Sequence, residues 1–186
     1  MMIWVALAGP SGAGKDSLLN EVRAEVAGDA RFHFARRTIT RPADAGGEEH
    51  EAVTGAEFEA LSSEGRFILQ WAAHGLRYGI RRNEAPAEKL VVISVSRSVL
   101  HEAAAIRRLR VVQVTAPVGV LAERLRRRGR ETEEQIAGRL EREMSLPSGL
   151  DIVTIQNDTT ISEGAVRLRA VLEAAASSCV DEAFRS

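Results

Sequence analysis

The sequence predicts an α/β fold in which a central parallel β-sheet is flanked by helices. Short apolar runs rich in β-branched residues alternate along the chain with longer segments of helical periodicity. The apolar runs show no regular polar–apolar alternation, as expected for strands that are covered on both faces. Because strands that alternate with helices pair in parallel, this order favours a doubly covered sheet.

Four strands and four helices account for most of the chain. The strands are expected at Ile3–Ala8, Leu90–Val95, Val111–Thr115 and Ile152–Ile155. The helices are expected at Lys15–Val26, Arg97–Arg108, Val118–Arg128 and Glu163–Ala176. The first apolar run is short and has no basic segment before it, so it is interpreted as a buried strand and not as a secretion signal.

Two segments interrupt this alternation. Residues 36–82 are rich in turn-forming residues and are expected to form a small insertion, and residues 126–143 are dense in arginine and are expected to form a helical lid. The chain of 186 residues is long enough for one well-buried domain. We therefore expect a single domain over 1–186, with a core formed by 1–35, 83–125 and 144–186.

The overall composition excludes several functional classes. A formal net charge of −1 gives no support to binding of nucleic acid or of a membrane surface. The single cysteine, Cys179, cannot form an internal disulfide and fits a reducing compartment. No apolar run is long enough to cross a bilayer, so a cytoplasmic location is expected. The oligomeric state is not readable from the sequence.

The stretch "GPSGAGKDS" nearly matches the phosphate-binding loop pattern G-x-x-x-x-G-K-[ST]. A predicted strand precedes it and an amphipathic helix follows it, which is the context that the mechanism of this loop needs. Glycines let the backbone approach phosphates, the helix N-terminus adds partial positive charge, and the lysine can reach the β- and γ-phosphates of ATP. The predicted nucleotide-binding residues of the loop are Gly9, Pro10, Ser11, Gly12, Ala13, Gly14, Lys15, Asp16 and Ser17.

Asp16 is unusual because this position ordinarily carries a hydroxyl. The strand expected to supply a second metal ligand, "VVISVS", offers Ser94 and Ser96 but no acidic residue. Asp16 is therefore predicted to bind Mg²⁺, which takes carboxylate oxygens readily and offsets the repulsion between Asp16 and the phosphates. In the alternative interpretation, Asp16 favours the helix N-terminus and Ser17 serves the phosphates.

A series of motifs along the chain resembles the guanylate kinase-like family of P-loop kinases. In order, they are "GPSGAGK", a "TRP" segment, "GRFILQW", "HGLRYGI", "RRRGRETEEQIAGRL" and "IQND". Within that family, "GKDS", "TITRPADAGGEEH" and "WAAHGLRYGI" resemble the ribose 1,5-bisphosphate phosphokinases. This resemblance implies transfer of the γ-phosphoryl group of ATP to ribose 1,5-bisphosphate, giving 5-phosphoribosyl 1-diphosphate in phosphonate degradation.

The resemblance also implies the acceptor-binding residues. Arg41 and Tyr78 match phosphate-binding positions of the family, and Arg37 is an additional cation beside them. Gln70 and Ile80 stand where guanylate kinases read guanine with a carboxylate and a hydroxyl. A glutamine lacks the two acceptor oxygens of a carboxylate and isoleucine offers no hydrogen bond, so these positions disfavour guanine. Gln70 is retained as an acceptor-binding residue; the extra arginines can also be solvated surface charges.

Three lid arginines are predicted to be catalytic together with Lys15. By resemblance, Arg128, Arg139 and Arg142 clamp the transferring phosphoryl group, and Asn157 lies near the adenine. The histidines form no metal cluster, and no nucleophile–base pair stands out. Transfer to an ionised phosphate oxygen needs neither, because positioning and charge neutralisation carry the catalysis.

Two other functions remain open from the residues alone. The first is a guanylate kinase or another nucleoside monophosphate kinase. The second is a binding module without catalytic activity, as some guanylate kinase-like domains are. The intact Lys15 and the arginine-rich lid argue against the second, and the residues Gln70 and Ile80 argue against the first.

Overall fold

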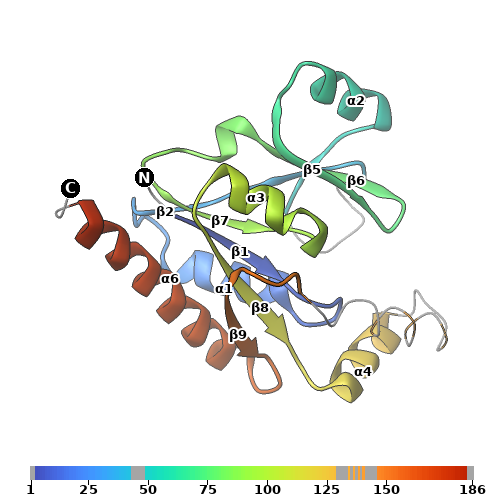
Figure 1. Cartoon of the computed structure of the whole chain (residues 1–186). Helices are drawn as coiled ribbons and strands as arrows, with labels where there is room; N and C mark the ends of the chain where they lie inside the picture. Colours follow the sequence, from blue (N-terminus) through green and yellow to red (C-terminus); the bar gives the residue numbers. More distant parts are fainter. Residues whose placement is uncertain are drawn as a thin grey trace.

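Five parallel strands form the central sheet of the computed structural model, in the order β2-β7-β1-β8-β9 (Figure 1). They are β1 (Trp4–Ala8), β2 (Phe32–Phe34), β7 (Leu90–Ser94), β8 (Leu109–Thr115) and β9 (Asp151–Gln156). The structure describes residues 3–42, 49–128, 134, 136, 138, 140 and 146–183, with the backbone alone at 128 and 179–183. All neighbouring strands pair in parallel, which confirms the predicted fold class. The short edge strand β2 was not predicted.

Strand β1 lies at the centre of the sheet and supplies side chains to both of its faces. Val5 and Leu7 belong to one hydrophobic cluster, whereas Trp4 and Ala6 belong to a second cluster on the opposite face. This division follows from the two-residue repeat of a strand. Because both faces are covered, every residue of β1 is apolar and buried.

Helices cover both faces of the sheet. The first cluster contains residues of α1 (Lys15–Glu25) and α6 (Ile161–Ala183), which pack against each other, and the second contains residues of α3 (Leu100–Ile106). A 3-10 turn, η2 (Arg97–Val99), begins the predicted helix Arg97–Arg108, and α4 (Val118–Arg128) follows β8 (Figure 1). No helix in the described ranges is long and apolar enough to span a membrane.

A second, four-stranded sheet occupies the predicted insertion, in the order β4-β3-β6-β5. Its strands are β3 (Arg37–Ile39), β4 (Glu51–Ala52), β5 (Phe67–Ala73) and β6 (Leu76–Arg81), with helix α2 (Gly55–Ser63) between β4 and β5. Thr54 and Glu57 form a capping box that starts α2. After β6, the 3-10 turn η1 (Arg82–Glu84) leads back to the central sheet.

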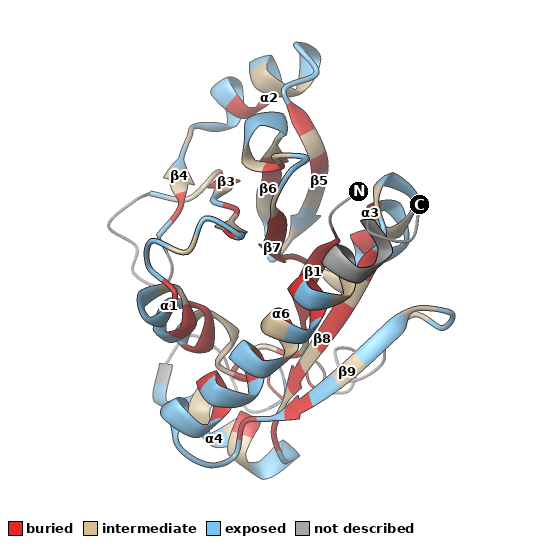
Figure 2. Ribbon diagram, turned by 90° about the vertical axis from the view of Figure 1, so that its left-hand side faces the viewer, coloured by how far each residue is buried: buried red, intermediate tan, exposed pale blue. Residues whose placement is uncertain are grey.

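The β5–β6 hairpin is anchored to the core by apolar packing. Leu69 and Ile80 are almost fully buried and share a hydrophobic cluster with Trp4, Val91 and Leu100. The buried colour in Figure 2 accordingly runs from β7 into the nearby end of β6. An isoleucine at position 80 is therefore explained by its place in the hydrophobic core, independently of the acceptor that the protein binds.

We expect Ile80→Ala to destabilise the protein by about 2–5 kcal/mol, because a fully buried aliphatic side chain leaves a cavity when it is truncated. Ile152→Ala is the matched control, since Ile152 is 37% exposed on β9. Urea unfolding of both variants measures the two free energies of unfolding. Equal and small losses would contradict the anchoring role of Ile80.

Candidate active site

A cavity of about 620 Å³ opens beyond the carboxyl ends of β1 and β7. Parallel strands end at the same edge of a sheet, so segments far apart in the sequence meet there. The segment after β1 contributes Gly9, Ser11, Gly12, Gly14, Lys15, Asp16 and Ser17. The small sheet and the segment after β7 line the rest, so the cavity lies between the core and the insertion.

The loop between β1 and α1 takes a backbone path that requires glycine. Gly9 has a φ of 140°, and a Cβ placed there would lie 2.0 Å from the carbonyl oxygen of Val114. Gly14 has a φ of 86°, and its Cβ would lie 2.4 Å from Nδ2 of Asn157. Positive φ and close backbone approach together exclude other residues. The backbone path of the loop therefore requires glycine at both positions, and phosphate binding by the loop stays a prediction.

Asn157 is hydrogen-bonded to the backbone of this loop. Its Nδ2 donates to the carbonyl oxygen of Ala13 at 2.7 Å, and its backbone N–H donates to Thr115 at 2.7 Å. Arg124 of α4 donates to the carbonyl oxygens of both Gly12, at 3.3 Å, and Asn157, at 3.0 Å. Asn157 is only 3% exposed and is not among the described residues that line the cavity. It acts as a support for the loop, and its contact with adenine stays a prediction.

Two of the predicted loop residues also serve the geometry of the loop. Pro10 has no N–H to offer a phosphate, and its carbonyl oxygen accepts the N–H of Ala13 at 3.2 Å. Both residues are buried and lie outside the described lining of the cavity. Lys15, by contrast, lines the cavity, and its Nζ donates to the carbonyl oxygens of Gly9 at 2.7 Å and Pro10 at 3.0 Å. These contacts keep the ammonium group over the loop backbone.

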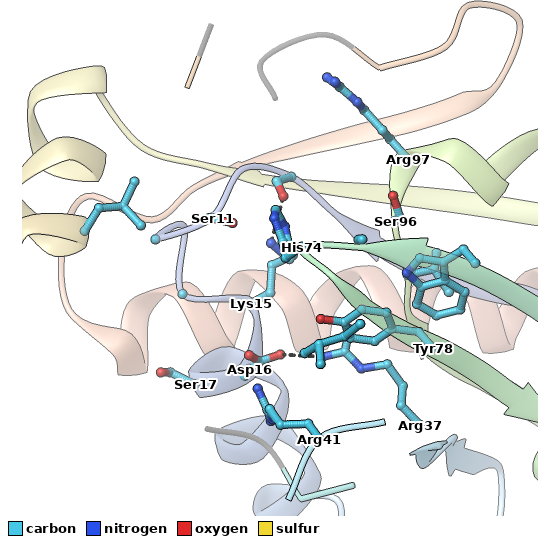
Figure 3. Close-up of a pocket in the computed structure, with 18 of the residues that line it drawn as sticks. Ser11, Lys15, Asp16, Ser17, Arg37, Arg41, His74, Tyr78, Ser96 and Arg97 are labelled. Carbon is cyan, nitrogen blue, oxygen red and sulfur yellow. Dashed lines mark hydrogen bonds and ion pairs between the residues drawn. The ribbon is translucent and has the colours of Figure 1, made fainter. Parts of the chain in front are cut away.

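Asp16 forms an ion pair with Arg37 across the cavity (Figure 3). Nη2 of Arg37 donates to Oδ1 of Asp16 at 3.4 Å. The Asp16 side chain is 43% exposed and that of Arg37 is 13% exposed. Because Asp16 lies in the first turn of α1 and Arg37 starts β3, the pair joins the nucleotide side of the cavity to the insertion. Asp16 of the loop is thus paired with Arg37, which belongs to the predicted acceptor-binding insertion.

The predicted acceptor residue Tyr78 completes an aromatic wall. The guanidinium carbon of Arg37 lies 5.8 Å from the centroid of the Tyr78 ring, and Tyr78 stacks on Trp71 with a 5.4 Å separation of ring centroids. All three side chains line the cavity. A guanidinium group held against an aromatic face keeps its planar set of donors oriented.

Arg41 also lines the cavity and is supported by the buried His50. Nε2 of the His50 ring lies 3.1 Å from the carbonyl oxygen of Arg41, and Nδ1 lies 3.4 Å from Nη2 of the same arginine. A neutral imidazole protonated on Nε2 satisfies both contacts, because it donates to the carbonyl oxygen and accepts from the guanidinium group. His50 therefore orients a predicted phosphate-binding residue.

Other arginines of the insertion turn away from the cavity. Arg77 pairs with Glu59 and Arg81 pairs with Glu51, while Nε of Arg82 donates to the carbonyl oxygen of Gly65 at 2.8 Å. None of these three is in the described lining. Their alternative interpretation as non-binding charges fits the structure better than a role in acceptor binding.

Gln70 differs from its predicted setting. Its Oε1 accepts a hydrogen bond of 2.9 Å from the hydroxyl of Ser62 on α2, and the residue is absent from the described lining. The neighbours Trp71 and Ala73 line the cavity, and side chains alternate across a strand. The geometry thus gives no support to acceptor binding by Gln70, which stays a prediction.

Among the polar residues that line the cavity, His74, Ser96 and Arg97 were not assigned to the site from the sequence. His74 has a φ of 53° in the turn of the β5–β6 hairpin, beside Gly75. Ser96 and Arg97 lie two and three residues after the end of β7. Ser96 and Arg97 could have been predicted from the sequence, because they come after a buried parallel strand and ligands of α/β sheets bind at that edge.

The predicted lid lies largely outside the described residues. Arg139 and Arg142 lie outside the described residues, and of Arg128 only the backbone, at the end of α4, is described. Nearby, Nε of Arg127 lies 3.0 Å from Oε1 of Glu123, an i,i+4 pair on α4. Catalytic roles for the three lid arginines stay predictions.

The described residues contain no group of three or more histidine, cysteine or acidic side chains that could enclose a metal ion. Magnesium usually needs no such group, because it binds through one or two protein ligands together with phosphates and water. Asp16 and Ser17 supply a carboxylate and a hydroxyl at the start of α1, and both line the cavity. The donor set therefore fits a magnesium ion that arrives with a nucleotide.

The fold is shared with solved kinase structures. The guanylate kinase of Anaplasma phagocytophilum has a TM-score of 0.65 and 17% identity, with 94% of this chain and 85% of that chain covered. A gluconokinase from Sinorhizobium meliloti 1021 has a TM-score of 0.51 and 19% identity, with 98% and 96% covered. At such identities the likeness shows the fold alone.

Curated relatives are more similar in sequence, whereas no protein-family model matches the chain. Ribose 1,5-bisphosphate phosphokinases from Brucella melitensis biotype 2 and Agrobacterium fabrum are 47% and 42% identical; the alignments cover 83% and 94% of this chain and 83% and 98% of those proteins. A bifunctional ribose 1,5-bisphosphokinase-thymidine phosphorylase of Azorhizobium caulinodans is 44% identical over 89% of this chain, which spans 25% of that protein's length. The chain belongs to the ribose 1,5-bisphosphate phosphokinase family.

Proposed function

We propose that this kinase transfers the γ-phosphoryl group of ATP to ribose 1,5-bisphosphate, giving 5-phosphoribosyl 1-diphosphate and ADP, in phosphonate degradation. The observation that carries the proposal is a single cavity in which a phosphate-binding loop with Lys15 faces Arg37 and Arg41 of the insertion. One side of this cavity suits a nucleoside triphosphate and the other suits a phosphorylated acceptor. The names of the relatives point to the same acceptor.

The donor side is assigned to the triphosphate of ATP. The glycine loop offers backbone N–H groups, the start of α1 adds partial positive charge, and Lys15 lies where the β- and γ-phosphates would bind. Asp16, with Ser17 beside it, would hold magnesium, which supplies charge neutralisation of the phosphates when it is bound. Lys15 stabilises the negative charge that develops during transfer, because its ammonium group is already oriented by two loop carbonyls.

The acceptor side needs cations rather than a general base. The attacking atom is an oxygen of the 1-phosphate, which is ionised at neutral pH, so no side chain has to remove a proton. Arg41, oriented by His50, and Arg37, held against Tyr78, would bind and orient this phosphate. The bond between the γ-phosphorus and its bridging oxygen to the β-phosphate breaks as the new bond to the acceptor oxygen forms, and ADP carries away the released charge.

An acceptor without a base fits the remaining lining. The two positions that read guanine in the resembling kinases carry Ile80, which is buried in the core, and Gln70, which is bonded to Ser62. The described lining near the hairpin is mainly apolar around Trp71 and Ala73. A buried site without matching hydrogen-bond partners discriminates strongly against a ligand that needs them.

The acceptor assignment is tested by the rate of ADP formation from Mg·ATP with ribose 1,5-bisphosphate, GMP and gluconate, each over a range of concentrations. We expect kcat/KM to be at least about 10³-fold higher for the bisphosphate than for GMP, since missing polar partners at a specific site cost factors of this order or more. A preference for GMP or gluconate would overturn the proposed acceptor. Absence of turnover and of ATP binding would instead favour a binding module.

We expect Lys15→Ala to lower kcat about 10²–10³-fold, which corresponds to about 3–4 kcal/mol of lost transition-state stabilisation. The fold should survive, because Lys15 contacts only loop carbonyls in its two described bonds and lines the cavity. Lys89→Ala is the matched control, since Lys89 is the other lysine of the chain and lies outside the described lining. Near-normal turnover by the purified Lys15 variant would refute the kinase interpretation of this loop.

For Asp16→Asn we expect weaker apparent affinity for magnesium with a smaller change in nucleotide affinity, because a neutral amide is a poorer ligand for a hard cation. The measurement is the rate against free magnesium at saturating ATP, together with calorimetric binding of ADP at low and high magnesium. Arg37→Lys is the control for the ion pair alone. If Asp16→Asn and wild type give superimposable magnesium curves while the acceptor KM changes, Asp16 orients Arg37 and does not bind the metal.

A further inference from the structure

The charge of the cavity exceeds what one phosphate of an acceptor would need. Of the described residues that line it, Lys15, Arg37, Arg41 and Arg97 are cationic and Asp16 is acidic. Lys15 is assigned to the nucleotide, and Arg37 and Arg41 are assigned to the reacting phosphate of the acceptor. Arg97 has no part in the reaction as described so far, although it lies in the same cavity.

Arg97 comes from a different part of the fold from the other two arginines. Arg37 and Arg41 belong to the insertion, whereas Arg97 begins η2, three residues after the end of β7 in the central sheet. In Figure 3, Lys15 and His74 lie between Arg97 on one side and Arg37 and Arg41 on the other. The cavity therefore has two cationic sides, one in the core and one in the insertion.

The segment that carries Arg97 is firmly anchored. Val95 and Val99, on either side of it, are 4% and 5% exposed and belong to the core cluster beneath α3. The hydroxyl of Ser96 accepts hydrogen bonds from the backbone N–H and the hydroxyl of Ser98, at 3.4 and 3.0 Å, which fixes the turn. Residues on rigid elements present their side chains with defined geometry, as a specificity-determining contact requires.

We propose that Arg97 binds the second phosphate of the acceptor, the 5-phosphate that does not receive the phosphoryl group. This inference rests on the proposed function, because it takes ribose 1,5-bisphosphate as the acceptor. The planar guanidinium group of arginine pairs with two oxygens of a phosphate, and such charge-assisted hydrogen bonds are strong and geometrically selective. A pentose with a phosphate at each end offers one anionic group to each cationic side, whereas a monophosphate offers one to a single side.

This placement makes Arg97 a selector for doubly phosphorylated acceptors. A bisphosphate would bridge the insertion and the core, so the two sides of the cavity would be held together by the acceptor itself. Ribose 1-phosphate would keep only the insertion contacts with Arg41, and ribose 5-phosphate would keep only the core contact with Arg97. Each phosphate of the acceptor then has its own side of the cavity, and the two sides can be tested separately through Arg41 and Arg97.

The test is calorimetric binding of ribose 1,5-bisphosphate, ribose 1-phosphate and ribose 5-phosphate to wild type, Arg97→Ala and Arg41→Ala. Arg97→Ala should weaken the bisphosphate and ribose 5-phosphate at least about 10-fold, the effect of losing a hydrogen bond to a charged group, and should change ribose 1-phosphate little. Arg41→Ala should show the reverse order. Arg97→Lys should recover part of the affinity, because it restores the charge without the planar pair of donors.

Arg110→Ala is the control, since Arg110 pairs with Asp151 at 2.9 Å between β8 and β9 and lies outside the described lining. It should bind all three ligands as wild type does. An Arg97→Ala variant that loses equal affinity for both monophosphates, or for neither, would overturn the inference. If the binding pattern holds but wild type does not phosphorylate the bisphosphate, the proposed reaction fails while the second phosphate site stands.

Discussion

Parallel pairing of β1 with β7 on one side and β8 on the other is the constraint on which the site depends. Strands that run in the same direction end at the same edge, so the segments that follow them meet although they are far apart in the sequence. The phosphate-binding loop follows β1, Arg97 follows β7, and α4 with Arg124 follows β8. The parallel pairing of β7, β1 and β8 is thus what brings the parts of the core site together.

The loop depends in turn on polar contacts beneath it. Asn157 and Arg124 donate to the carbonyl oxygens of Ala13 and Gly12, so the carbonyl groups are satisfied on the inner side of the loop. The buried setting of Asn157 makes such bonds stronger than they would be in water. Arg124 belongs to α4, the helix that precedes the predicted lid segment in the sequence. Its hydrogen bond to Gly12 therefore connects the loop to this helix.

The elements that the sequence predicted well are those with strong local patterns. The glycine loop, the apolar strands and the helix after Lys15 follow from the chemistry of neighbouring residues. Strand β2 has three residues and β4 has two, which is too short for a periodic pattern to appear. The boundary between η2 and α3 likewise depends on packing that a local pattern does not contain.

The partners of the arginines could not be predicted from local sequence. Arg77 and Arg81 are neutralised by Glu59 and Glu51, which other elements bring to them, while Arg37 turns to Asp16. These choices depend on the fold of the small sheet. The face of the sheet on which a side chain lies is also hard to predict, because a shift of one residue moves it to the opposite face. Gln70 was assigned to the acceptor from a motif alone, whereas its neighbours line the cavity.

The central claim is that the two sides of one cavity bring together ATP and a pentose that already carries phosphate groups. Phosphorus NMR of the reaction of the purified chain with Mg·ATP and ribose 1,5-bisphosphate tests it most directly, because it identifies the bond that forms. The account predicts a pair of coupled diphosphate resonances from the sugar, with an unchanged signal from its 5-phosphate and one ADP formed per product. A sugar spectrum unchanged after ATP has been consumed, or a new resonance at the 5-phosphate, would contradict it.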